Sequence, residues 1–429
     1  MQRSAFSLLF LNLFWFGASH AQITVTGQPV PELAAFDNAI KTMMNNHGIT
    51  AAELAVTWQG RLVMAHGYTR SPGANDITVQ PDSLMRIASN SKQVTSILIN
   101  RLIQDGKLSL TDTVGQFVSL TPPPGKSADP RLANVTVRNL LEHLAGFGNY
   151  TGSDNIARDP MFSDPQIAQD IGGGLPVSQA SIIRAMNGTT LASQPGTTFR
   201  YSNYGYLLLS KVIEKASGMS YADYANSVFK PLGVRTMRLA RSLPANRAPN
   251  EVAYYSGWTR ATVMDNSNAT VPYEYGGFNI ENMDSHGGWI MSATELVRIF
   301  SNLDHPNAAD AVLNTVSLNR MFGLPQNYPL PYQQGEPFYA QGWSVRDYGN
   351  GHRNTWHDGS LPGTTSYAVR IQDGWDYVAI FNRRDESGQT SYSGELDTLM
   401  WQARNSISQW PAHDLFSTEL EGMFYNGFE

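Results

Sequence analysis

The 429-residue sequence contains no cysteine. A chain without cysteine forms no disulfide bonds, and it can use neither a thiol nucleophile nor a cysteine-ligated metal. Its stability must therefore come from the size of its core, and 41% of the residues are hydrophobic, which is ample for a large core.

Long basic runs and several familiar enzyme motifs are also missing. The formal net charge of -6 argues against a general nucleic-acid-binding protein. The sequence contains no H-E-x-x-H, no Gly-rich phosphate loop and no G-x-S-x-G. These absences disfavour a metalloprotease, a nucleotide-dependent enzyme and an α/β-hydrolase.

The N-terminus carries the longest apolar run. Arg3 gives a positive start, residues 5–16 (AFSLLFLNLFWF) form a short apolar core, and Ala21 ends a small-residue cleavage site. This pattern predicts a signal peptide over residues 1–21. A membrane anchor is the less favoured alternative, because the run is short and contains Asn12. We therefore expect a periplasmic or secreted protein without a membrane span after cleavage.

Apolar periodicity predicts strands near both ends of the chain and helices between them. Alternating apolar residues predict hairpins over 52–68 and 365–383, and helical spacing predicts helices over 31–47, from about 89 to 104, over 203–217 and over 394–409.

The simplest arrangement is one sheet built from both ends of the chain, with a helical insertion between them. The sequence between them then forms an inserted, mostly helical domain. The expected boundaries are 22–84 and 286–410 for the sheet domain, 85–285 for the helical domain and 411–429 for a C-terminal tail.

The stretch RIASNSKQ places Ser89 three residues before Lys92, ahead of an apolar helix. A serine hydroxyl needs a base within hydrogen-bond reach, and positions i and i+3 of a helix share a face. The S-x-x-K spacing therefore has a chemical reason. On the spacing alone, an N-cap serine followed by a surface lysine is an equally good interpretation of this stretch. A second match, Ser227 and Lys230, lies at a helix end and is disfavoured as a catalytic pair.

Two further stretches carry candidate site residues. Tyr201 and Asn203 stand at a loop-to-helix junction, where a phenol and an amide can point into one cleft. His357 and Gly359 precede a strand-like run, and a glycine there would let a substrate approach the backbone. Each stretch, taken separately, has a simpler interpretation. Asn203 could be a helix N-cap with Tyr201 as a packing residue, and His357 could be a solvated histidine in a turn.

Three other histidines have less specific interpretations. His143 is interpreted as structural or as supporting the site, and His286 and His352 as loop residues.

The sequence carries three motifs in the order S-x-x-K, Y-x-N and H-x-G. In this it resembles the serine β-lactamase and penicillin-binding-protein superfamily, specifically its class C β-lactamase-like branch. The likeness extends to TVRNLLEHLAGF, to QPGTTFRYSNYGYLLLSKVI and to GGWIMSATELVRIF, and it runs from roughly residue 32 to 405. It implies a β-lactamase/transpeptidase-like fold of the α/β (α+β) class, which is an antiparallel sheet flanked by helices plus a helical domain, with the active site between them.

The resemblance also implies residue roles. Ser89 would be the acylated nucleophile with Lys92 as its partner, and Tyr201 would be the general base, although either Lys92 or Tyr201 could take the first proton. Asn203 would position Lys92 and the substrate amide. The oxyanion hole would comprise the N–H groups of Ser89 and Ser360.

One departure from the family pattern concerns the substrate. His357, Asp358 and Gly359 stand where β-lactamases and carboxypeptidases usually carry Lys-Thr-Gly. A histidine is mostly neutral at pH 7 and attracts a substrate carboxylate less strongly.

The sequence therefore predicts an exported serine hydrolase that cleaves an ester or amide, of the esterase or D-amino-acid peptidase or amidase type, without a metal or cofactor. The alternatives are a β-lactamase or D,D-carboxypeptidase, an acyl-transferase, and a catalytically silent relative that binds cell-wall peptides.

Overall fold

The computed structural model describes residues 22–70 and 77–417. The predicted signal peptide, residues 1–21, lies outside the described residues, as do residues 418–429 of the predicted tail. In the part that is described, no helix has the length and apolar character needed to cross a membrane.

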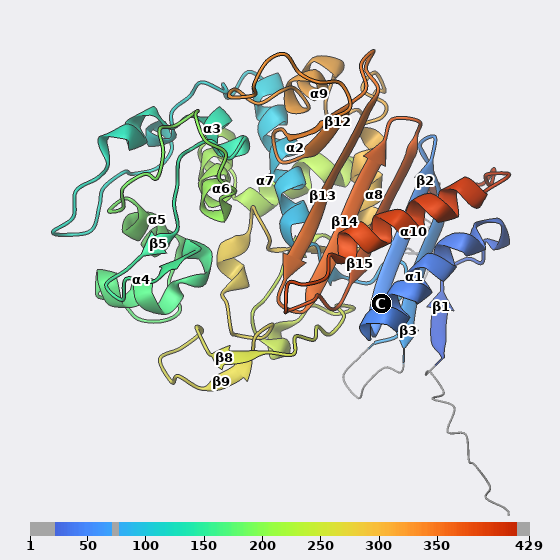
Figure 1. Cartoon of the computed structure of the whole chain (residues 1–429), viewed down its shortest axis with the longest axis horizontal. Helices are drawn as coiled ribbons and strands as arrows, with labels where there is room; N and C mark the ends of the chain where they lie inside the picture. Colours follow the sequence, from blue (N-terminus) through green and yellow to red (C-terminus); the bar gives the residue numbers. More distant parts are fainter. Residues whose placement is uncertain (1–21, 71–76, 418–429) are drawn as a thin grey trace, which may run out of the picture.

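An antiparallel eight-stranded sheet forms the centre of the molecule (Figure 1). Its strand order is β1-β3-β2-β15-β14-β13-β12-β11, so that strands from both chain ends lie in one sheet. This confirms the predicted fold class. The strands are β1 (Ile23–Thr26), β2 (Ala51–Trp58), β3 (Arg61–Arg70), β11 (Pro337–Tyr339), β12 (Ser344–Asp347), β13 (Arg353–Leu361), β14 (Thr364–Ile371) and β15 (Trp375–Phe381).

Both predicted hairpins are confirmed. The β2–β3 turn is Gln59-Gly60, whose φ angles of 51° and 79° fit the primed turns that match strand twist. The chain ends meet where β15 pairs with β2, with Phe381 opposite Ala52 and Trp375 opposite Trp58. This pairing closes the sheet across more than three hundred residues of sequence.

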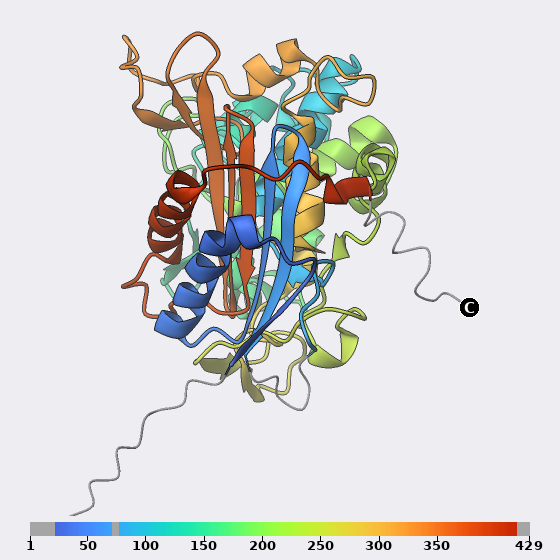
Figure 2. The same cartoon turned by 90° about the vertical axis from the view of Figure 1, so that its right-hand side faces the viewer.

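Helices cover both faces of the sheet (Figure 2). On one face lie α1 (Ala34–His47) and α10 (Tyr392–Ser406), whose apolar residues share a core with Leu54, Val56 and Tyr377. On the other face α8 (Ala293–Asn302) packs against β2 and β15. Because alternate residues point to opposite faces, Ala55 belongs to this second core.

The predicted helix 203–217 is confirmed as α6 (Asn203–Ser217). The Ser202 hydroxyl caps its start by accepting a hydrogen bond from the Gly205 N–H, and Gly218 ends it at φ 74°. The other helices are α2 (Ser91–Gln104), α3 (Val137–Leu141), α4 (Asp164–Ile171), α5 (Gln179–Met186), α7 (Tyr221–Phe229) and α9 (Thr315–Met321). The short strands are β4 (Met85–Arg86), β5 (Tyr150–Thr151), β6 (Ala157–Arg158), β7 (Arg238–Leu239), β8 (Thr259–Ala261), β9 (Thr270–Pro272) and β10 (Trp289–Met291).

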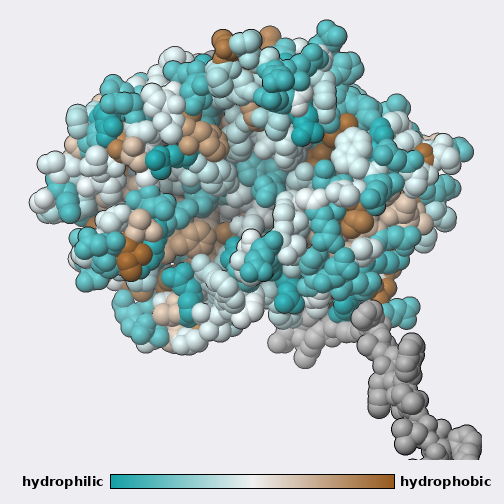
Figure 3. All heavy atoms as spheres, viewed as in Figure 1, coloured by the Kyte–Doolittle hydropathy of each residue, from teal (hydrophilic) through white to brown (hydrophobic). Residues whose placement is uncertain are grey.

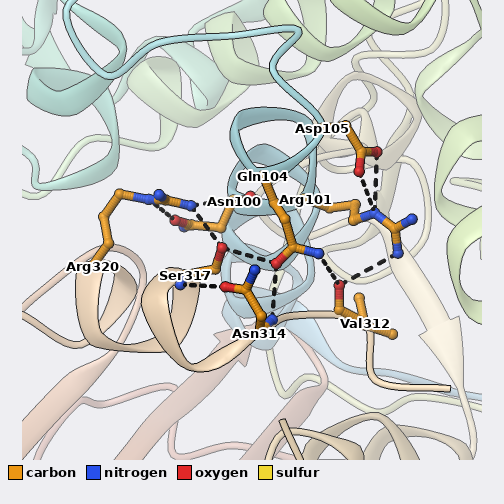
Figure 4. A network of polar contacts seen from close by, with 8 residues as sticks. All are labelled: Asn100, Arg101, Gln104, Asp105, Val312, Asn314, Ser317 and Arg320. Carbon is orange, nitrogen blue, oxygen red and sulfur yellow. Dashed lines mark hydrogen bonds and ion pairs between the residues drawn. The ribbon is translucent and has the colours of Figure 1, made fainter. Parts of the chain in front are cut away.

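A polar network ties the end of α2 to α9 (Figure 4). The Arg320 guanidinium donates to Asn100 and to Ser317, and Gln104 Oε1 accepts from the Asn314 N–H and the Ser317 hydroxyl. These contacts anchor the helix whose first turn carries Lys92. The domain boundaries proposed above remain a prediction.

Candidate active site

The candidate nucleophile lies on a tight turn rather than inside a regular helix. Ser89 is the middle residue of the 3-10 turn η2 (Ala88–Asn90), and α2 starts two residues later. Ala88 has φ 46°, a left-handed conformation that is costly for a residue with a Cβ atom. Because the turn leads straight into α2, the i and i+3 spacing still brings Lys92 Nζ to 3.0 Å from Ser89 Oγ.

Lys92 is fully buried and has three polar partners. Besides Ser89 Oγ, its Nζ lies 2.8 Å from Asn203 Oδ1 and 3.0 Å from the His286 carbonyl oxygen. Burial lowers the pKa of Lys92 to about 7, against the opposing influence of the carboxylates of Asp159 and Asp358. A large part of the population therefore has a neutral amine at neutral pH.

Asp159 determines the orientation of the Asn203 amide. The Asn203 Nδ2 group donates to Asp159 Oδ2 at 2.8 Å, and a carboxylate can only accept here. The amide oxygen must therefore face Lys92. Asp159 is itself held as the cap of η5 (Pro160–Phe162), where it accepts from the Met161 N–H.

Tyr201 completes the contacts of the serine. Its hydroxyl donates to Ser89 Oγ at 3.0 Å, and Lys92 Nζ lies 4.6 Å from the centre of its ring. Tyr201 exposes 45% of its surface, but protein atoms closely surround its hydroxyl, and this burial raises its pKa. The carboxylates of Asp358 and Asp159 raise it further, so the phenol is protonated at neutral pH.

His357 lies in a buried hydrogen-bond chain that the sequence did not reveal. Its Nε2 is 3.1 Å from the Tyr339 hydroxyl, which is 3.2 Å from His143 Nε2. At the far end, the Ser202 N–H donates to His143 Nδ1 at 3.1 Å. This chain of hydrogen bonds thus links β13 to Ser202, the residue between Tyr201 and Asn203.

The backbone groups at the two ends of this hydrogen-bond chain determine which atom donates in each of its hydrogen bonds. His143 Nδ1 must accept from the Ser202 N–H, so that neutral His143 donates from Nε2 to Tyr339. Tyr339 then donates to His357 Nε2, whose Nδ1–H donates to the Asp358 carbonyl at 2.6 Å. Both rings must be neutral in this pattern. In agreement, burial and the charge of Lys92 lower the pKa of His143, and the same causes lower that of His357 to about 4.

His357 and Gly359 precede the predicted strand, which is β14, but they lie inside a further strand, β13, that the sequence did not reveal. Residues 355, 357, 359 and 361 are buried and alternate with more exposed ones. Because several of the buried positions hold polar residue types, the sequence does not show this alternation as an apolar pattern.

Gly359 is required by the protein itself. A Cβ atom there would lie 2.4 Å from the Ile87 carbonyl and 2.1 Å from Ser366 Oγ. The Ser366 hydroxyl donates to the Ile87 carbonyl at 2.6 Å and accepts from Asn90 Nδ2 at 3.1 Å. Gly359 thus lets the sheet approach the turn that carries Ser89. This close contact is a reason for the glycine that the sequence did not reveal, and the approach of a substrate to Gly359 stays a prediction.

Ser360, the predicted second oxyanion-hole residue, follows Gly359 on β13 and is exposed, opposite Thr365 of β14. Asp358 is also exposed. The strand therefore presents Asp358 and Ser360 on one face and His357 and Gly359 on the other.

The remaining candidates lie elsewhere or act through their backbone. The Ser227 hydroxyl donates to the Tyr224 carbonyl within α7, and Lys230 is exposed. His352 is an exposed turn residue, whereas His286 is buried in a turn from which its carbonyl reaches Lys92. Within residues 22–70 and 77–417, no three His, Asp or Glu side chains are grouped so as to hold a metal ion.

Sequence reasoning missed Asp159, Tyr339 and the His286 carbonyl. Asp159 precedes a proline in RDPMF, which signals a capped turn but not a contact to Asn203. Tyr339 stands in YAQGWSV, which contains no catalytic motif. A backbone carbonyl leaves no signal in the sequence.

Comparison with known proteins decides the family. The family model described as "Beta-lactamase" matches residues 36–395. The chain belongs to this family. This match, together with the relative penicillin-binding protein 4*, supports the serine β-lactamase and penicillin-binding-protein superfamily, whose members are serine hydrolases.

Among curated relatives, penicillin-binding protein 4* of Bacillus subtilis is 25% identical over 81% of this chain and 70% of its own length. A probable fimbrial assembly protein FimD of Dichelobacter nodosus is 35% identical over 152 residues, which cover 35% of this chain and 33% of that protein. The chain thus spans about a third of the latter.

Among solved structures, the D-amino acid amidase of Ochrobactrum anthropi SV3 in complex with L-phenylalanine shares the fold. Its TM-score is 0.62 at 22% identity, with 87% of this chain and 100% of that chain covered.

Proposed function

We propose that this member of the β-lactamase family is an exported serine hydrolase that cleaves an ester or amide through an acyl-enzyme on Ser89. The observation that carries the proposal is the position of Ser89 Oγ, 3.0 Å from both Lys92 Nζ and Tyr201 Oη. A serine next to an amine of lowered pKa and a protonated phenol has both a proton acceptor and a proton donor.

In this proposal Lys92 takes the proton of Ser89. A neutral amine has two N–H groups and one lone pair. The Asn203 and His286 oxygens occupy the two N–H groups, and this leaves the lone pair for the serine hydroxyl. Of the two bases that the sequence left open, Lys92 and Tyr201, the proposal therefore takes Lys92.

Ser89 Oγ then attacks the carbonyl carbon while the Ser89 and Ser360 N–H groups bind the oxyanion. When the bond to the leaving group breaks, Tyr201 donates its proton to that group and regains one from Lys92. Water releases the acyl group by the reverse series of proton transfers. Balanced over both steps, one ester or amide and one water give an acid and an alcohol or amine.

The preferred substrates are simple esters and amides of D-amino acids. At the position of the lysine of Lys-Thr-Gly this chain has His357, which is buried with a pKa of about 4 and is therefore uncharged at neutral pH. β-Lactams and D-Ala-D-Ala peptides both carry a carboxylate. A β-lactamase or D,D-carboxypeptidase is therefore the second choice.

A substrate panel tests this proposal. It comprises p-nitrophenyl esters, D-aminoacyl amides, nitrocefin and D-Ala-D-Ala peptides. Wild type should turn over one of the first two classes, Ser89→Ala should lose this activity, and Ser227→Ala should keep it as the matched control. If Ser89→Ala retained full turnover, the proposal would fail. If folded wild type turned over no substrate, the peptide-binding alternative would be favoured.

Export is part of the proposal and needs its own measurement. The N-terminal sequence of protein recovered from the periplasm or medium of an expressing bacterium should begin at Gln22. Retention of residues 1–21 in a membrane fraction would contradict this part of the proposal.

A further inference from the structure

A groove of about 690 Å³ lies among the helices, apart from Ser89. We call it the α5–α6 groove, because it is bounded by α5, by the C-terminal half of α6 and by the loop over residues 117–121. The surface in Figure 3 is hollowed between the helical part and the sheet, whereas every residue that lines this groove belongs to residues 117–215. Lys211, which lines it, follows Asn203 by about 12 Å along α6. The groove is therefore separate from the candidate active site.

The floor of the α5–α6 groove is apolar. Its apolar lining residues are Phe117, Val118, Ala180 and Ile183. Phe117, Val118 and Ile183 are half-buried and pack against the core beneath them. Because these side chains are recessed, they can contact a hydrocarbon chain that enters the groove, but they do not project far enough to enter a bilayer.

The neutral polar groups of the groove are already paired with one another. Asn187 is buried, and its Nδ2 donates to the Ser119 carbonyl at 2.9 Å and to the Thr121 carbonyl at 3.2 Å. The Ser119 and Thr121 hydroxyls share a hydrogen bond of 2.9 Å. These bonds hold the loop against the end of α5, and they leave few partners for the backbone of a bound peptide.

The charges of the groove do not cancel. Lys211 is paired with Glu214, with 2.8 Å between Nζ and Oε2. Arg184 and Lys215 are exposed, and neither has a hydrogen bond or ion pair to any residue that the structure describes. The lining thus has a net positive charge, although the whole chain has a formal net charge of -6. Two unpaired cations therefore stand beside the apolar floor.

We propose that the α5–α6 groove binds a single-chain anionic amphiphile, whose carboxylate faces Arg184 and Lys215 while its hydrocarbon chain covers the apolar floor. Two unpaired cations select an anionic head group. A floor whose polar neighbours are already paired selects a hydrocarbon chain over a peptide, because peptide groups without hydrogen-bond partners are costly to bury. The volume of the groove lies in the range of small-molecule sites.

Calorimetric titration of the full chain with dodecanoate tests the proposal. Wild type should bind octanoate about tenfold or more weakly than dodecanoate, because fewer methylene groups are buried. It should not bind dodecyltrimethylammonium, which has the same chain and the opposite charge. Arg184→Gln combined with Lys215→Gln should weaken dodecanoate binding about tenfold, as expected for two partly solvated charge contacts, and added salt should weaken it in wild type. Ala180→Trp should also weaken it, by filling the groove without changing a charge.

Two controls show whether dodecanoate binds at this place. Lys230→Gln removes an exposed lysine from a different groove and should bind dodecanoate as wild type does. Ser89→Ala should do the same, which separates the groove from a carboxylate product held at the active site.

The proposal would be overturned if the double variant and Ala180→Trp both bound dodecanoate as tightly as wild type, or if Ser89→Ala lost the binding. Equal affinity for dodecyltrimethylammonium would overturn the role of the two cations. Wild type that bound no dodecanoate would also overturn the proposal, and if it then bound vesicles of phosphatidylglycerol, the cations would serve a membrane surface instead.

Discussion

Substitution of Gly359 by alanine provides a sharp test of the site geometry. The added Cβ atom would lie 2.4 Å from the Ile87 carbonyl oxygen, whereas ordinary contact begins at 3.4 Å. The Ser89 turn or β13 must therefore move by about 1 Å. Overpacking of this kind costs about 1–3 kcal/mol, and a shift of about 1 Å at reacting groups can lower the rate about a hundredfold.

We expect Gly359→Ala to lower Tm by roughly 2–8 °C and to slow fluorophosphonate labelling of Ser89 about a hundredfold. Gly257→Ala is the matched control, because Gly257 is exposed and has no atom within 4 Å of its built Cβ position. The double variant Gly359→Ala with Ser366→Ala should remain impaired, since the backbone oxygen stays in place. Wild-type Tm and wild-type labelling in Gly359→Ala would refute the close approach of sheet and turn.

The other predictions concern protons and hydrogen bonds. First, kcat/KM for an uncharged ester should rise with pH and level off above about 7, because neutral Lys92 is the active form; a rise that continued to pH 10 would contradict this. Second, Asp159→Asn should move this rise to lower pH, because it removes a charge that raises the Lys92 pKa; an upward move would show that the carboxylate acts differently. Third, Tyr339→Phe should leave His143 and His357 without their shared partner and cost about 1–3 kcal/mol of stability by calorimetry, whereas the exposed Tyr348→Phe should have no effect.

The sequence predicted those parts of the fold that depend on local patterns. Ser202, Gly218 and the apolar spacing between them specify α6, and alternation with a Gln-Gly turn specifies the β2–β3 hairpin. Strands near both chain ends also predicted one shared sheet, but local patterns do not show that β15 pairs with β2. The family resemblance added that the sheet is antiparallel.

Within the site, motif residues could be predicted but their supporting contacts could not. The i and i+3 spacing places Lys92 next to Ser89 wherever the chain is helical. The Asp159–Asn203 and Tyr339–His357 contacts join segments far apart in sequence, and only the folded chain brings them together. The fit of Gly359 against Ile87 likewise depends on the packing of β13 on η2.

The most direct test of the central claim is the intact mass of the protein after incubation with a fluorophosphonate, followed by peptide mapping. Wild type should gain a single adduct on Ser89, and Ser89→Ala should gain none. A folded wild-type protein that gains no adduct, or one that carries it on another serine, would contradict the assignment of Ser89 as the nucleophile.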